Sequence, residues 1–263
     1  MPDDLVYVYA ILTAALPVAV AGIDGRPLRF VQDDGLVAAV SDVPAAEFDE
    51  EPLNARVRDL SWLGPRAVAH ETVNAELWSR SPASLPLAFG TVFRDDAGVR
   101  TLLRSQAVAL QRRLAAVAGR AEWVVALHRA GAPSAEQLAQ ASAALGDLRA
   151  QIATSAPGRA HLLRRRLGEL ERETLRRLDA EAADALIGLL GGVADDVFRE
   201  PLPADAVERP LARLSVLVAQ SAEAALQQRF AQARARWPEP TYQVQVTGPW
   251  PPYRFGGLER GDG

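Results

Sequence analysis

The sequence predicts an α+β protein of two domains, and three observations support this. The chain has 263 residues, which exceeds the commonest size of a single domain. Apolar runs with the two-residue period of strands alternate with segments that carry the longer period of helices. The second half has the order strand, helix, strand, strand, helix, strand, which is that of the ferredoxin-like, split βαβ fold. We therefore expect an N-terminal α+β domain over residues 1–119 and a modified ferredoxin-like domain over residues 120–263.

The first domain begins with an uncharged stretch, residues 5–23, that is long enough to cross a membrane. Asp3 and Asp4 precede it and Pro17 interrupts it, so we interpret it as a buried strand followed by a turn and expect no membrane span. The turn residues Asp33-Asp34-Gly35 predict a strand hairpin after it. The expected elements are strands over 5–11, 28–31 and 36–40, a loop over 47–51, a helix over 61–80 capped by Ser61, an extended run over 85–93, and a helix over 99–118.

The second domain follows with shorter apolar runs separated by turns. Its expected elements are strands over 121–127, 193–198, 211–218 and 242–246, and helices over 135–152 and 221–237. Between the first helix and the second strand, a long charged helix is inserted at about 157–192. Its leucines recur on one side and its arginines alternate with glutamates. We interpret it as a solvated helix on one apolar stripe, and the alternative is a surface that binds an anionic partner or another helix.

The chain ends in a C-terminal arm, residues 247–263. Pro249, Pro251 and Pro252 fix the backbone and remove hydrogen-bond donors, which predicts a stiff, extended segment.

Trp250, Tyr253 and Phe255 belong to the 16 aromatic residues of the chain (5 Trp, 4 Tyr and 7 Phe), and such a concentration of rings favours burial against a surface. We expect them to contact Phe89 and Trp62 of the first domain and to fix the orientation of the domains. Alternatively, some of the rings dock on a partner.

Composition argues against several classes of function. The net charge of −4, from 33 acidic and 29 basic residues, is unlike that of a nucleic-acid-binding protein. The chain has no cysteine, which excludes disulfides and thiolate chemistry and fits a reducing cytoplasm.

No catalytic or cofactor-binding motif emerges from the sequence. His70, His128 and His161 lack the spacing of metal ligands, and we expect His70 to lie on a helix surface or in packing between the domains. The paired aspartates fall in or beside turns, and no glycine-rich phosphate-binding loop is present. We therefore expect no catalytic residue, no metal and no cofactor.

Several stretches together resemble the GvpF/GvpL family of gas vesicle proteins over essentially the whole chain. Their order along the chain is also that of the family. They are Tyr7-Val8-Tyr9-Ala10, Leu36–Ser41 with Val43-Pro44, Ala69-His70-Glu71, Leu85-Pro86-Leu87-Ala88-Phe89-Gly90-Thr91-Val92-Phe93, Gly158-Arg159-Ala160-His161-Leu162-Leu163, and Thr247-Gly248-Pro249-Trp250-Pro251-Pro252-Tyr253-Arg254-Phe255. The last stretch is the most specific. Ala88 stands where the family usually has a basic residue, and His161 replaces a tyrosine.

This resemblance implies a two-domain α+β protein that is not an enzyme. It implies an accessory or minor structural role in the assembly of gas vesicles in the cytoplasm. The implied partners are the small hydrophobic shell protein, GvpA, and other gas vesicle accessory proteins. An alternative function is a regulatory protein that senses a small molecule through its ferredoxin-like module.

Overall fold

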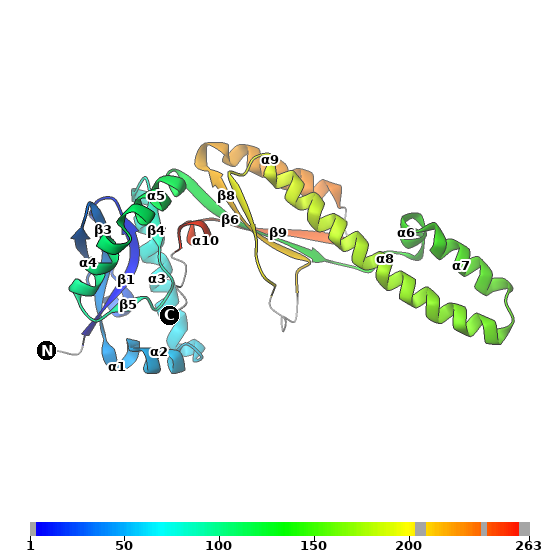
Figure 1. The fold of residues 1–263 in the computed structure, drawn as a ribbon, viewed down its shortest axis with the longest axis horizontal. Helices are drawn as coiled ribbons and strands as arrows, with labels where there is room; N and C mark the ends of the chain where they lie inside the picture. The colour runs from blue at the N-terminus through cyan, green and yellow to red at the C-terminus, as the bar shows by residue number, and fades with distance from the viewer. Residues whose placement is uncertain (1–3, 203–208, 238–240, 258–263) are drawn as a thin grey trace. The chain divides into compact units, whose positions relative to one another are not determined.

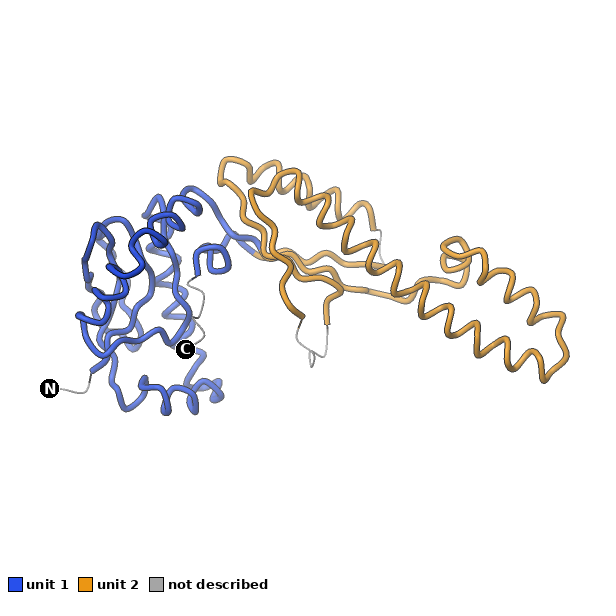
Figure 2. Tube along the Cα trace, in the orientation of Figure 1, with its two compact units in different colours: residues 1–123, 248–263 blue, residues 124–247 orange. Residues whose placement is uncertain are grey.

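A computed structural model of the chain describes residues 4–202, 209–237 and 241–257 (Figure 1). The chain forms two compact units, of which unit 1 comprises residues 1–123 and 248–263 and unit 2 comprises residues 124–247 (Figure 2). The boundaries fall inside strands β6 (Arg120–Arg129) and β9 (Tyr242–Trp250). From Gly248 onward the arm belongs to unit 1, although it was expected in the second domain. Its short helix α10 (Tyr253–Gly256) packs on elements of unit 1.

Unit 1 is built on an antiparallel sheet with the strand order β2-β3-β1-β4, in which β5 also pairs with β1. The pairing of β1 with β3 shifts register between Val8 and Ala10. Tyr9 is the extra residue of this bulge, so Tyr9 and Ala10 both join the same hydrophobic cluster. The strands are β1 (Asp4–Leu12), β2 (Arg29–Asp33), β3 (Leu36–Pro44), β4 (Ser84–Pro86) and β5 (Val92–Phe93).

Helices cover both faces of this sheet. Helices α4 (Asp96–Ser105) and α5 (Ala107–Val117) bury one apolar face with Val6 and Val8 of β1. The buried residues of that face are Val99, Leu103, Ala107, Leu110, Leu114 and Val117. On the opposite face, α1 (Ala45–Phe48) and α3 (Leu60–Arg80) pack against Tyr7 and Tyr9. The alternation of side chains along β1 therefore supplies both cores.

Three local expectations for unit 1 were wrong. The expected loop over 47–51 contains the end of α1 and the start of α2 (Glu50–Arg56), because the Asp49 carboxylate accepts the Glu50 N–H and two glutamates fill the first turn. Asp59, rather than Ser61, caps α3 by accepting the Ser61 N–H. The expected helix over 99–118 is divided into α4 and α5 at Gln106.

Unit 2 has the sheet order β7-β8-β6-β9, which is the order of a ferredoxin-like, split βαβ fold. The expected helix over 135–152 is two helices, α6 and α7, that meet at Ser142. The inserted helix α8 runs from Pro157 to Gly191, and α7 packs along it. The elements are α6 (Ala135–Ala141), α7 (Ala143–Thr154), α8 (Pro157–Gly191), β7 (Asp196–Arg199), β8 (Ala212–Ala219) and α9 (Glu223–Arg236).

Within the described residues, none of the helices combines the length and the apolar character needed to cross a bilayer.

Candidate functional site

The interior of unit 1 contains an aromatic cluster centred on His70, whose side chain is only 2% exposed. Its ring centroid lies 5.8 Å from those of Tyr7 and Tyr9 on β1 and 5.7 Å from that of Phe89. The ring of Tyr253, from the arm, lies 6.5 Å away. Segments that are far apart in the sequence therefore meet at one histidine.

Phe48 and Trp62 extend this aromatic cluster on the side of α1. The Phe48 centroid is 5.8 Å from that of Tyr7 and 5.4 Å from that of Trp62, which is in turn 6.4 Å from Phe89. The Trp62 indole donates to Glu47 at 2.8 Å, and the Arg66 guanidinium lies 4.5 Å over the Trp62 ring. At the outer edge of the cluster, the Trp62 indole thus has a carboxylate as its hydrogen-bond acceptor and a cation over its ring.

Polar groups inside the aromatic cluster form a connected set. The Gly90 N–H donates to the Tyr7 hydroxyl at 3.1 Å, and this hydroxyl is 2.9 Å from His70 Nδ1. The Asn74 amide lies 3.0 Å from His70 Nε2, one helical turn along α3. Burial lowers the pKa of His70 to about 4, so the imidazole is uncharged at neutral pH.

Burial also decides the protonation of the neighbouring groups. It raises the pKa of the Tyr7 and Tyr253 phenols, so both stay protonated. The Tyr253 hydroxyl is buried near Asn74 and Glu71 but outside hydrogen-bond geometry with either. Partial desolvation of its carboxyl group likewise raises the pKa of Glu71, although the residue as a whole is exposed. The cluster therefore presents neither a charged histidine nor a phenolate, and it is suited to packing rather than to proton transfer.

The loop between β4 and β5 carries Phe89-Gly90-Thr91 and is fixed to β1 on both sides. The Leu87 N–H donates to Tyr9 O at 2.8 Å, and the Val8 N–H donates to Thr91 O at 2.9 Å. Gly90 has a φ of +84°, and a Cβ there would lie 2.8 Å from Leu53 Cδ2. A glycine is needed here both for the backbone conformation and for the close approach of α2.

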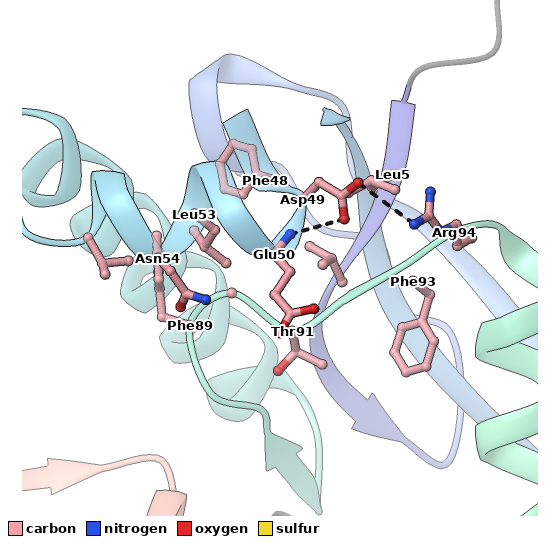
Figure 3. Close-up of a pocket in the computed structure, with 13 residues that line it drawn as sticks. Leu5, Phe48, Asp49, Glu50, Leu53, Asn54, Phe89, Thr91, Phe93 and Arg94 are labelled. Atoms are coloured by element: carbon pink, nitrogen blue, oxygen red, sulfur yellow. Dashed lines mark hydrogen bonds and ion pairs between the residues drawn. The ribbon is translucent and has the colours of Figure 1, made fainter. Parts of the chain in front are cut away.

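A groove of about 610 Å³ lies between α2 and this loop (Figure 3). Its apolar lining comes from both core and surface positions, and charged side chains stand at its rim, where Arg94 is 3.8 Å from Asp49. The lining residues are Leu5, Phe48, Leu53, Val57, Phe89, Val92 and Phe93, with Asp49, Glu50, Asn54, Gly90, Thr91 and Arg94.

The described part of the arm, residues 247–257, is anchored on unit 1 mainly through its last residues. Phe255 packs against the hydrophobic cluster under α4 and α5. The buried Glu122 carboxylate accepts the Arg254 N–H at 2.7 Å, and the Arg113 guanidinium donates to Gly257 O.

The arm is not extended throughout, contrary to expectation. β9 continues to Trp250, but Tyr253–Gly256 form a helical turn that is closed by the Gly256 N–H donating to Pro252 O at 2.7 Å.

The structure brings together only part of the site that was expected from the sequence. Phe89, Trp62 and Tyr253 share the aromatic cluster, while Phe255 lies in the other core and Pro251 and Pro252 are buried. Pro249 is exposed, and the Trp250 side chain is 44% exposed.

Sequence reasoning missed the polar centre of the site. His70 lies inside unit 1 rather than on a helix surface or between domains, and Tyr7, Asn74, Phe48 and Glu122 were not proposed. The alternation Tyr7-Val8-Tyr9 was the available signal, because it places two phenols on one face of a buried strand.

The similarity to known proteins covers both units. The family model described as "Gas vesicle synthesis protein GvpL/GvpF" matches residues 5–256. The chain belongs to this family. A curated relative, gas vesicle protein L of Streptomyces sp. (strain CB03234), is 37% identical over 99% of this chain and 96% of its own length. Gas vesicle protein L2 of Halobacterium salinarum is 29% identical over 95% of this chain and 90% of its own length.

Two solved structures share the fold. The gas vesicle protein GvpF of Anabaena sp. PCC7120 has a TM-score of 0.76 and 18% sequence identity, and the alignment covers 97% of this chain and 99% of that one. GvpF of Microcystis aeruginosa has a TM-score of 0.70 and 17% identity, with the same coverage. The expected α+β fold class and the membership in the GvpF/GvpL family are confirmed, and the protein has a role in gas vesicles.

The close approach at Gly90 generates the first prediction. Gly90→Ala places a Cβ 2.8 Å from Leu53 in a backbone conformation that L-residues rarely adopt. We expect the free energy of unfolding to fall by about 1–3 kcal/mol, measured by urea denaturation. Gly64→Ala is the matched control, because a Cβ in that position of α3 meets nothing within 4 Å. It should be neutral or stabilise by up to about 1 kcal/mol, and equal losses in both variants would contradict the argument.

The buried imidazole generates a pH prediction. The folded pKa of His70, about 4, lies below its ordinary value of 6.5, so the unfolded chain binds the proton more tightly and stability falls as the pH decreases through this window. Relative to His70→Gln, the wild type should lose roughly 2 kcal/mol between about pH 7 and about pH 4.5. Glu71 titrates in both proteins and its raised pKa acts in the opposite direction, so the comparison isolates His70. Parallel pH profiles of unfolding free energy would show that His70 is not buried uncharged.

The unequal burial of the arm rings generates a third prediction. Tyr253→Ala removes a half-buried ring from the aromatic cluster and should lower the unfolding free energy by about 2–4 kcal/mol. Tyr253→Phe should cost little, because the hydroxyl has no hydrogen-bond partner. Trp250→Ala should cost less than Tyr253→Ala, because the Trp250 side chain is 44% exposed. Thermal denaturation ranks the three variants by stability. A larger loss of stability for Trp250→Ala than for Tyr253→Ala would contradict this account of the arm.

Proposed function

We propose that this protein supports gas vesicle assembly by binding the hydrophobic shell protein, and that the groove beside the Phe89-Gly90-Thr91 loop receives apolar side chains of that partner. The observation that carries the proposal is the groove itself, an open volume of about 610 Å³ in which aliphatic and aromatic side chains share the lining with charged and polar groups. The role in gas vesicles comes from the family, and the aliphatic and aromatic side chains within the groove suit the hydrophobic partner that the family resemblance implies.

The lining of the groove suits protein recognition. Leu53, Val57 and Phe89 are only half-buried, so they leave apolar surface that a partner can cover. Asp49 and Glu50 stand at one side of the rim and Arg94 at another (Figure 3). A hydrophobic centre with a charged rim is the usual anatomy of a protein interface.

The groove is also held in a fixed shape before any partner binds. Phe89 packs on His70 and Trp62, and the hydrogen bond from Gly90 to Tyr7 fixes the adjoining backbone. A preformed site loses less conformational entropy on binding. This favours a binding role for the aromatic cluster over a catalytic one.

We assign the arm residues two parts within this proposal. Pro251, Pro252, Tyr253 and Phe255 act as a clasp that holds the end of the chain on unit 1, where all four are buried or half-buried. Trp250 and Pro249 remain exposed beside them and form a second contact with the partner, since tryptophan is enriched among the residues that dominate binding energy. The protein acts as an accessory or minor structural component in the cytoplasm, at the gas vesicle, rather than as an enzyme.

Retention by immobilised shell protein tests the proposal. Leu53→Asp and Val57→Asp each place a charge in the groove, and we expect affinity to fall about tenfold or more, because covering one such side chain contributes about 1.5–3 kcal/mol. Val108→Asp is the matched control, because Val108 on α5 is 82% exposed and lies outside the groove. Circular dichroism verifies that each variant is folded.

Two results would count against this function. Unchanged retention of both groove variants would show that the shell protein binds elsewhere. No retention of the wild-type protein, together with thermal stabilisation by a small molecule, would support the sensing function instead.

A further inference from the structure

Strand β9 ends the sheet of unit 2 on one side, with the order β7-β8-β6-β9. Within residues 4–202, 209–237 and 241–257, no strand pairs with its outer side. The Ala130 N–H, which follows β6, donates to Thr241 O at 3.1 Å. Because the inward and outward backbone groups of a strand alternate, those of Tyr242, Val244 and Val246 point away from β6.

From Tyr242 to Thr247 the side chains of β9 do nothing to block this edge, and Pro249 near the end of the strand is its only proline. The segment Tyr242–Trp250 has the sequence YQVQVTGPW and carries no charge over nine residues. The opposite edge strand, β7, is only four residues long and carries Asp196 and Arg199, both exposed. Short length, charge and proline are the usual protections of an edge strand, so β7 is protected, whereas β9 is unprotected as far as Thr247.

We propose that β9 pairs antiparallel with β9 of a second copy of this chain, across a two-fold axis near Gln245. This register uses the outward groups fully, because Val244 and Val246 of one copy then lie opposite Val246 and Val244 of the other. Gln245 lies opposite Gln245 of the second copy, and Gln243 lies opposite Thr247 of the second copy. The two sheets become one continuous sheet.

The lack of charge in β9 favours a second copy of this chain as the partner that pairs with its edge. In a two-fold pairing every side chain meets either itself or a residue of the same strand, so a charged strand risks opposing like charges. A neutral strand avoids this in every register, and the two-fold arrangement closes on itself as a dimer. The side chains of Tyr242 and Val244 already face the core, at 8% and 7% exposure, while Val246 is half-buried and gains cover from the pairing.

Two measurements on the full chain, of its mass in solution and of its cross-linking, test whether this dimer forms. Analytical ultracentrifugation over a wide concentration range should show a monomer–dimer equilibrium. The chain has no cysteine, so a single Gln245→Cys can be oxidised without background, and its thiols should form an intermolecular disulfide because opposed residues bring their Cα atoms within about 4.5–5.5 Å. Arg213→Cys is the control, an exposed position on β8 in the interior of the same sheet, and should stay reduced.

A proline variant separates this edge from other interfaces. Val246→Pro removes an outward N–H but no hydrogen bond to β6, so the monomer should remain folded by circular dichroism while the dimer is weakened at least tenfold. A wild-type protein that stays monomeric at all concentrations overturns the proposal. So does a dimer that persists in Val246→Pro, or one in which Gln245→Cys links no better than Arg213→Cys.

Discussion

The hydrogen bond between the Tyr7 hydroxyl and His70 Nδ1, 2.9 Å long, is the interaction on which the architecture of unit 1 depends. Both side chains are buried among aromatic rings, where an unpaired polar group would cost more than the bond itself contributes. Their pairing therefore fixes the depth and rotation of α3 over β1. It also requires the Gly90 N–H, which donates to the same hydroxyl, so the β4–β5 loop has to close over the pair.

The same contact joins two surfaces that appear unrelated along the chain. Phe89 packs on one side of His70 and also lines the groove, while Tyr253 packs on His70 from the arm. The shape of the groove thus depends on a histidine that the arm helps to cover. A neutral imidazole serves this purpose better than a charged one, because a cation among these rings would have to be solvated.

The two units carry different parts of the proposed binding behaviour. The groove lies wholly in unit 1 and is proposed for the shell protein, whereas the free edge of β9 in unit 2 is proposed for a second copy of the chain. Neither proposal needs the other, since one rests on apolar side chains and the other on unpaired backbone groups. Two separate binding surfaces on one chain would suit a protein that connects several components of a growing gas vesicle.

Most of the fold was predictable because local patterns and tertiary packing agree. The buried strand β1, the order of the ferredoxin-like unit and the inserted helix α8 all follow from hydrophobic periodicity. The segment 47–51 was mistaken for a loop because its acidic residues suggest solvent, although one of them caps α2.

The site was harder to predict, because it depends on contacts across the sequence. Trp62, Phe89 and Tyr253 were proposed together from their aromatic character, but His70 was not, since nothing local distinguishes a buried histidine from an exposed one. Its burial depends on a strand 63 residues earlier in the chain.

A double-mutant cycle between Phe89→Ala and Tyr253→Ala tests the central claim most directly. Both rings contact His70, on the groove side and on the arm side. If the histidine connects them, the effects of the two substitutions on the unfolding free energy should be coupled by at least about 0.5 kcal/mol. Strict additivity would contradict the account, because it would mean that the arm and the groove are stabilised independently.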